Sequence, residues 1–280
     1  MGAPAHLIDP ETLARLTAPV ILDCRFDLAD PDKGRRLYAE GHLPGADFAD
    51  LDRDLSGPIG AMTGRHPLPD TGALARRLGA WGIGSDTSVV VYDDLGGAFA
   101  ARLWWLLRWL GHLDVRLLDG GLQAWTAAGG TLTRDAPTRE ARDFAQRADA
   151  DAWVSTPDLV ELLARGRIEV IDARAPARFR GESEPIDPVA GHIPGAINLP
   201  LQGNLGEDGR FLPAHLLRER FLAAIGTRDP REVAHSCGSG VNACHNLLAM
   251  EIAGLQGSRL YAGSWSEWIR SPDRPVAVGA

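Results

Sequence analysis

Short apolar runs alternate with longer amphipathic stretches along the whole chain. A short apolar run between turn residues is typical of a strand buried in a sheet, whereas apolar positions that recur with helical spacing are typical of a helix. In the first half we therefore predict strands at 20–23, 88–92 and 116–118, and helices that include 74–79, 98–110 and 122–128.

The second half repeats this alternation. Here the pattern predicts strands at 169–172, 232–236 and 259–261, and helices at 214–225, 243–253 and 266–271. Apolar strands separated by helices form parallel sheets that are covered on both faces. The predicted fold class is therefore α/β, with a mostly parallel sheet flanked by helices in each half.

The two halves also resemble each other in sequence. Three pairs of segments match in order, at separations of 143 to 150 residues: Val20–Arg25 with Val170–Arg174, Gly41–Ala46 with Gly191–Ala196, and Gly120–Trp125 with Gly263–Trp268. A period this long indicates a duplicated domain, not a solenoid. We predict domains at 1–133 and 153–280, joined by a charged, Ala-rich linker at 134–152.

Length and charge agree with this organisation and narrow the possible partners. The chain has 280 residues, which fits about two domains. With 29 basic and 37 acidic residues its net charge is -8, which disfavours nucleic acid or an anionic membrane as a partner. A small anionic substrate would need a local cluster of Arg or Lys side chains.

The sequence predicts a cytoplasmic protein with reduced thiols. The segment Met1–His6 has neither the basic nor the apolar region of a secretory signal, and the apolar stretch Leu103–Leu110 is too short to span a bilayer. The three cysteines, Cys24, Cys237 and Cys244, include no Cys-x-x-Cys pair. Neither a disulfide framework nor a cysteine zinc site is therefore expected.

Cys237 differs from the other two cysteines by its position. It follows an apolar strand and precedes a glycine-spaced loop that opens a helix, where open α/β sheets bind ligands. Backbone N–H groups and the positive end of a helix favour the thiolate, which is the nucleophilic form. Cys24 and Cys244 fit the ordinary interpretation of a buried structural cysteine, although Cys244 could also be a resolving thiol.

Two other kinds of site fit this loop less well. The segment Gly238–Ala243 matches a dinucleotide-binding pattern, but no acidic residue ends the next strand, at 261–262, to bind a ribose. A cysteine phosphatase would need an arginine six residues after the cysteine, where this chain has Ala243. Both kinds of phosphate chemistry are therefore disfavoured.

The same residues resemble those of tandem-domain rhodaneses, the thiosulfate and 3-mercaptopyruvate sulfurtransferases. The resemblance rests on the paired Gly-His-x-Pro-Gly-Ala motifs, on the Gly-Ser-Trp-x-Glu-Trp segment at Gly263–Trp268 and on Cys-Gly-Ser-Gly-Val at Cys237–Val241, and it covers nearly the whole chain. In that family only the second domain carries the nucleophile. The counterpart of Cys237 in the first half is about Asp93, so the first domain would be a degenerate copy.

The resemblance implies covalent sulfur transfer without a metal or organic cofactor. Cys237 would take sulfur from a donor as a persulfide and pass it to a thiol, thioredoxin or cyanide. The loop amides would hold the negative charge of the outer sulfur; this predicts substrate contacts at Gly238, Gly240, Val241, Asn242 and Ala243. A carrier that loads sulfur once for a partner protein is the non-enzymatic alternative.

Donor choice follows from the residues next to Cys237. Thiosulfate-type loops carry basic side chains there, whereas Gly238 and Ser239 resemble the 3-mercaptopyruvate type, so thiosulfate is the second donor hypothesis. In the mercaptopyruvate type a proton relay is proposed, and its matching residues here are Ser239, His66 and Asp52, the last two from the first domain. A turn-capping imidazole is the alternative for His66.

The resemblance also predicts how the donor carboxylate is held. Arg178 matches the arginine that binds it in the family, and its alternative is a surface charge. A second arginine is often found nine residues later, where this chain has Asp187; Arg180 or Arg65 could substitute for it. The loop also departs from the family at Asn242, where Thr or Ser is usual.

Overall fold

The computed structural model describes residues 6–280; the segment 1–5, on which part of the signal-peptide prediction rests, lies outside the described residues. The chain forms two compact units. The first unit contains Met1–Gly57, Pro69–Asp149 and Glu207–Phe211, and the second contains Pro58–Leu68, Ala150–Gly206 and Leu212–Ala280. Each unit thus takes most of one repeat and one short segment of the other.

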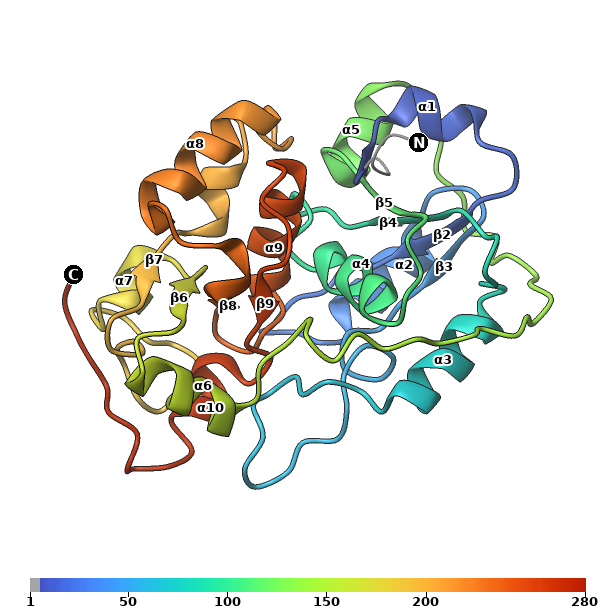
Figure 1. Ribbon diagram of the computed structural model, residues 1–280. Coiled ribbons are helices and arrows are strands. Elements are labelled where there is room, and N and C mark those ends of the chain that lie inside the picture. The colour runs from blue at the N-terminus through green and yellow to red at the C-terminus, as the bar shows by residue number, and fades with distance from the viewer. Residues whose placement is uncertain (1–5) are drawn as a thin grey trace. The chain divides into compact units, whose positions relative to one another are not determined.

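The first unit is built on a five-stranded parallel sheet, which runs β1 (Leu7–Ile8), β5 (Val115–Leu118), β4 (Val89–Tyr92), β2 (Val20–Asp23), β3 (Ala46–Phe48). Its helices are α1 (Pro10–Arg15), α2 (Lys33–Glu40), α3 (Thr71–Ala80), α4 (Ala100–Trp109) and α5 (Gly121–Ala127). Figure 1 shows α1 and α5 on one face of this sheet and α4 on the other. The helices therefore cover both faces, as predicted.

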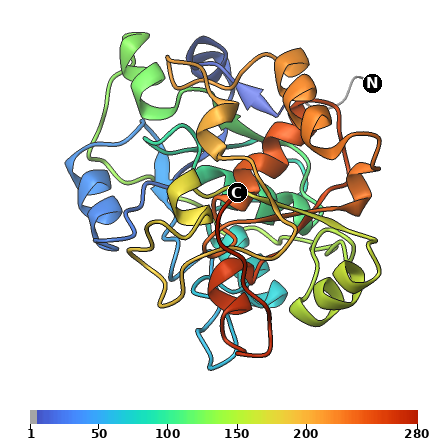
Figure 2. The ribbon, with the colours of Figure 1, turned by 90° about the vertical axis from the view of Figure 1, so that its left-hand side faces the viewer.

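The second unit has a four-stranded parallel sheet in the order β7 (Ile197–Asn198), β6 (Glu169–Asp172), β8 (Val233–Ser236), β9 (Arg259–Leu260). Its helical segments are α6 (Thr156–Ala164), α7 (Pro176–Phe179), η1 (Leu201–Asn204), α8 (Ala214–Ile225), η2 (Pro230–Glu232), α9 (Ala243–Ile252) and α10 (Ser264–Trp268). Beyond α10 the chain returns to α7, where the N–H of Gly279 donates to the carbonyl of Arg180 (Figures 1 and 2).

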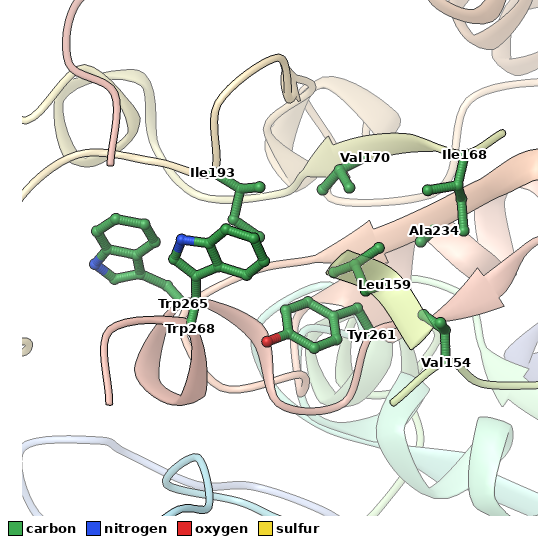
Figure 3. Packing of buried hydrophobic residues seen from close by; sticks show 9 residues of the cluster. All are labelled: Val154, Leu159, Ile168, Val170, Ile193, Ala234, Tyr261, Trp265 and Trp268. Atoms are coloured by element: carbon green, nitrogen blue, oxygen red, sulfur yellow. The ribbon is translucent and has the colours of Figure 1, made fainter. Parts of the chain in front are cut away.

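The core of the second unit explains why its strands and helices form where the apolar pattern predicts them. One face of the sheet contributes Ile168, Val170 and Ala234, and these pack against Leu159 of α6 and Trp265 of α10 (Figure 3). Side chains alternate between the two faces of a strand. Strand β8 therefore directs Ala234 into this core, while its neighbours Val233 and His235 point to the face covered by α8 and α9.

The α/β prediction is confirmed, and the strands at 20–23 and 169–172 and the helix at 214–225 agree residue for residue. The alternation did not predict the short strands β1, β3 and β7, because two or three residues show no measurable period. The residues predicted as a linker, 134–152, form no helix or strand, and those up to Asp149 belong to the first unit. There Arg142 and Arg147 donate backbone hydrogen bonds to Gly79 and Leu110.

The repeated Gly-His motifs have a structural role. His42 and His192 are both buried, and each places Nδ1 within 2.8 Å of a backbone carbonyl. The ring of His42 stacks on Tyr38, and that of His192 stacks on Phe179.

Among residues 6–280, no helix is both long and apolar enough to cross a membrane.

Candidate active site

Cys237 lies at the carboxyl end of β8, a central strand of the second sheet, and is 2% exposed. The N–H of Gly240 donates to its Sγ over 3.2 Å. Gly240 has φ +80°, and a Cβ there would lie 2.4 Å from the carbonyl oxygen of Ala262. Only glycine can therefore give the loop this curvature.

The Gly263–Trp268 segment holds the backbone of this loop. Ser264 Oγ accepts from the N–H of Cys237 over 3.0 Å, and the N–H groups of Trp265 and Ser266 donate to the carbonyls of Cys237 and Gly238. Ser264 has φ +52°, a left-handed conformation that costs about 1 kcal/mol or more for a residue with a Cβ. In the sequence, the Gly263–Trp268 motif indicated the repeat but did not indicate that it contacts the Cys237 loop.

A segment of the first repeat, 58–68, belongs to the second unit and is called the arm below. Gly64 allows the arm to approach α10, because a Cβ there would lie 2.6 Å from the carbonyl oxygen of Gly263. The N–H of Arg65 donates to Ser266 Oγ, and Arg270 Nε donates to the carbonyl of Thr63. These contacts bring Arg65 and His66 to the same loop that carries Cys237.

The structure brings His66 and Ser239 together. His66 Nδ1 lies 2.7 Å from Ser239 Oγ, and both residues are buried. Ser239 is the second residue after Cys237, so this hydrogen bond is part of the cysteine loop. Asp52, the third residue of the predicted relay, is exposed in the first unit, where its N–H donates to Asp50.

Arg178, at the end of α7, is held by two carboxylates. Its Nε and Nη2 donate to Glu184 over 3.2 and 2.6 Å, and Nη2 also lies 3.3 Å from Asp187. Asp187 forms a second ion pair with Nη1 of Arg65 in the arm. Of the two arginines considered as substitutes at this site, Arg65 is therefore next to Asp187, whereas Arg180 pairs with Glu182 at the surface.

Burial acts on both carboxylates of this cluster. It raises the pKa of Asp187, and the charges of Arg65 and Arg178 offset this increase only in part. Burial also opposes ionisation of Glu184, but hydrogen bonds from Arg178 and from the backbone outweigh it and lower the pKa of Glu184. The cluster thus places two guanidinium groups and two carboxyl groups beside the cysteine loop.

In the first unit Asp93 takes the place that Cys237 takes in the second. The N–H of Leu122 donates to the carbonyl of Asp93, as that of Trp265 does to Cys237. The Asp93 carboxylate accepts four backbone hydrogen bonds of 2.8 to 2.9 Å, from Leu95, Gly97, Phe99 and Ala100. This loop therefore binds an anion, and in the first unit that anion is its own side chain.

The other two cysteines, Cys24 and Cys244, are also buried. Burial, with the nearby carboxylates of Asp23 and Asp93, raises the pKa of Cys24 and keeps it as a thiol. Cys244 donates through Sγ to the carbonyl of Gly240 over 3.4 Å. Within residues 6–280 the cysteines form no disulfide, and no group of three or more His, Cys, Asp or Glu side chains is arranged to hold a metal ion.

Comparison with known proteins gives the same result for both halves. The rhodanese-like domain matches residues 9–128 and 155–271. A Pseudomonas aeruginosa protein named as a probable 3-mercaptopyruvate sulfurtransferase is 55% identical over 283 residues, covering 100% of both chains. A Mycobacterium tuberculosis protein with the provisional name thiosulfate sulfurtransferase SseB is 43% identical over 260 residues, covering 92% of this chain and 90% of its own.

A solved structure adds the fold to this sequence similarity. The 3-mercaptopyruvate sulfurtransferase from Leishmania major superposes with a TM-score of 0.85 at 32% identity, covering 96% of this chain and 76% of that one. The matched part of this chain includes residues of both units. The chain therefore belongs to the rhodanese family of sulfurtransferase enzymes, with the rhodanese-like domain present twice.

Proposed function

We propose that this enzyme moves sulfur from 3-mercaptopyruvate through a persulfide on Cys237 to a thiol acceptor, such as thioredoxin, or to cyanide. The hydrogen bond between His66 Nδ1 and Ser239 Oγ is the observation that carries the choice of donor. A donor whose leaving group is a carbon anion needs a proton, and this pair can supply one beside the nucleophile. Thiosulfate releases sulfite, which needs no such proton.

The proposed reaction has two steps. In the first, the Cys237 thiolate forms a bond to the donor sulfur, the carbon–sulfur bond breaks, and its electron pair leaves with pyruvate as an enolate. A proton passed through Ser239 and His66 converts that enolate to pyruvate, with Asp52 as the proposed third member of the relay. In the second step an acceptor thiolate attacks the outer sulfur of the persulfide, which restores the Cys237 thiolate.

The loop amides are proposed to bind the outer sulfur of the persulfide. The N–H of Gly240 already donates to Cys237 Sγ, and the matching loop of the first unit holds a full negative charge on Asp93 with four N–H groups. Such amides stabilise an anion without needing to reorganise. This supports a role for the backbone of Gly238 to Ala243 in substrate binding.

Thiosulfate is the second candidate donor, since Arg65 and Arg178 both lie near Gly238 and could bind its oxygens. The test is a comparison of kcat/KM for 3-mercaptopyruvate and thiosulfate with cyanide as the common acceptor. Our proposal expects a preference for 3-mercaptopyruvate, and a preference for thiosulfate would refute it. Continued turnover also separates an enzyme from a carrier, which would load one sulfur and stop.

We further propose that the enzyme works in the cytoplasm. Its cysteines are buried without a disulfide in the described part of the chain, and the chemistry needs a reduced Cys237. Fractionation of cells followed by detection of the protein tests this location. Recovery from an oxidising compartment would contradict it.

A further inference from the structure

Two arginines from separate segments converge on the residue that follows the nucleophile. A Cβ built on Gly238 would lie 2.9 Å from Nη2 of Arg65 and 3.6 Å from Nη1 and Nη2 of Arg178. Arg65 comes from the arm and Arg178 from α7. Glycine at 238 therefore leaves a space beside Cys237 that two guanidinium groups border and that a side chain would fill.

The carboxylates leave part of each guanidinium available. Glu184 takes the Nε and Nη2 atoms of Arg178, and Asp187 takes Nη1 of Arg65. Nη2 of Arg65 is the atom nearest to Gly238, and its Nε is buried without a hydrogen-bond partner among residues 6–280. A buried donor without a partner is costly, so an oxygen from a ligand would be favourable there.

We propose that Arg65 binds the anionic group of the sulfur donor beside Arg178, the arginine that the family resemblance assigns to the donor carboxylate, and that Asp187 is a positioning residue that holds Arg65 at this site. The inference rests on the proposed function and deepens it. Where relatives often carry an arginine, this chain has Asp187, and the guanidinium comes from the arm instead. Asp187 has the opposite charge to the arginine found there in relatives, and it pairs with Arg65. A second arginine is therefore still present beside Arg178 to bind the donor.

The charge of the cluster also bears on which donor fits. The guanidinium groups of Arg65 and Arg178 are balanced by Glu184 and Asp187, both nearly buried as side chains. Arg174 also contacts Glu184, but its own charge is balanced by Asp172. A single carboxylate can bridge the two free guanidinium edges, whereas the dianion thiosulfate would add a second negative charge near Asp187. Asp187 is therefore expected to favour a carboxylate donor over thiosulfate.

The first experiment measures KM and kcat for 3-mercaptopyruvate with cyanide as acceptor, together with the Kd of pyruvate by calorimetry. Arg65→Gln is expected to raise both KM and Kd about tenfold or more, since a charge-assisted hydrogen bond is lost, while kcat changes less. Arg65→Lys keeps the charge without the planar fork and is expected to give a smaller rise. The matched control Arg180→Gln removes an arginine of the neighbouring surface ion pair and is expected to change neither.

The second experiment concerns Asp187. Asp187→Asn is expected to raise the ratio of kcat/KM for thiosulfate to that for 3-mercaptopyruvate about tenfold, because a negative charge is removed from the cluster. Glu182→Gln removes the same charge from the surface and is the control. The proposal is overturned if Arg65→Gln and Asp187→Asn each behave like their controls.

The choice of 3-mercaptopyruvate as donor and the anion site at Arg65 can be refuted separately. If the wild-type enzyme prefers thiosulfate, the proposed donor is wrong. In that case a rise of about tenfold in the thiosulfate KM of Arg65→Gln alone still supports the anion site, and an unchanged KM refutes it.

Discussion

His66 Nδ1 lies 2.7 Å from Ser239 Oγ, although 173 residues separate the two in the sequence. The contact exists because the arm, 58–68, belongs to the second unit, while the rest of its repeat belongs to the first. A buried hydroxyl thus meets a buried imidazole two residues beyond the nucleophile. That arrangement suits a group that must hold and deliver a proton.

Removal of this imidazole should separate the two donors. We expect His66→Ala to lower kcat/KM for 3-mercaptopyruvate about a hundredfold, because the enolate loses its proton donor, and to lower that for thiosulfate much less. Steady-state kinetics with cyanide as the common acceptor checks this. The control His215→Ala changes an exposed histidine and should leave both donors unaffected. An equal loss for the two donors would count against the relay.

Asp93 should be essential to the stability of the first unit. Its carboxylate accepts four backbone N–H groups, and Asp93→Asn would turn two hydrogen-bond donors toward them, at a cost of about 3 kcal/mol in the free energy of unfolding. Urea unfolding followed by circular dichroism measures this change. Burial and the charge of Asp93 raise the pKa of Asp94, so Asp94→Asn should be neutral or stabilising. A wild-type midpoint for Asp93→Asn would disprove this role.

His235 should make stability depend on pH. It is fully buried in β8 beside Met250, and burial lowers its pKa from 6.5 to about 3. The unfolded chain therefore binds this proton more readily, and the stabilisation present above pH 6.5 is lost as the pH falls toward 3. At pH 5 the loss is about 2 kcal/mol.

Unfolding midpoints at pH 7 and pH 5 test this contribution. His235→Leu should show a smaller decrease in stability between the two pH values than the wild type, by about 2 kcal/mol. His215→Leu, at an exposed position, should keep the full decrease. Equal decreases for both variants would mean that His235 does not titrate in this way.

Local patterns predicted the parts of the fold that depend on neighbours in sequence. Strand β8, the glycine-spaced loop after Cys237 and helix α9 follow from apolar spacing and turn residues, and they place the nucleophile. The repeat then located Asp93 as the counterpart of Cys237, and the shared backbone contacts of the two residues agree with that match.

Contacts between distant residues were beyond such patterns. In the sequence, Asp187 stands where a positive charge is expected, and nothing nearby indicates a replacement. Its partner Arg65, which supplies that charge, lies 122 residues away. Likewise nothing local shows that Gly64 packs against Gly263, and this close approach carries the arm into the second unit. Ser264 was visible within a motif, but its hydrogen bond to Cys237 depends on how β8 and α10 meet.

Sulfur is proposed to pass through Cys237. Incubation of the enzyme with 3-mercaptopyruvate without an acceptor, followed by mass spectrometry of the intact chain and its peptides, would detect this persulfide. We predict the addition of one sulfur atom on the peptide that contains Cys237, its removal by cyanide, and no addition in Cys237→Ser. A persulfide that persists in Cys237→Ser, on Cys244 or Cys24, would show that Cys237 is not the residue that carries the sulfur.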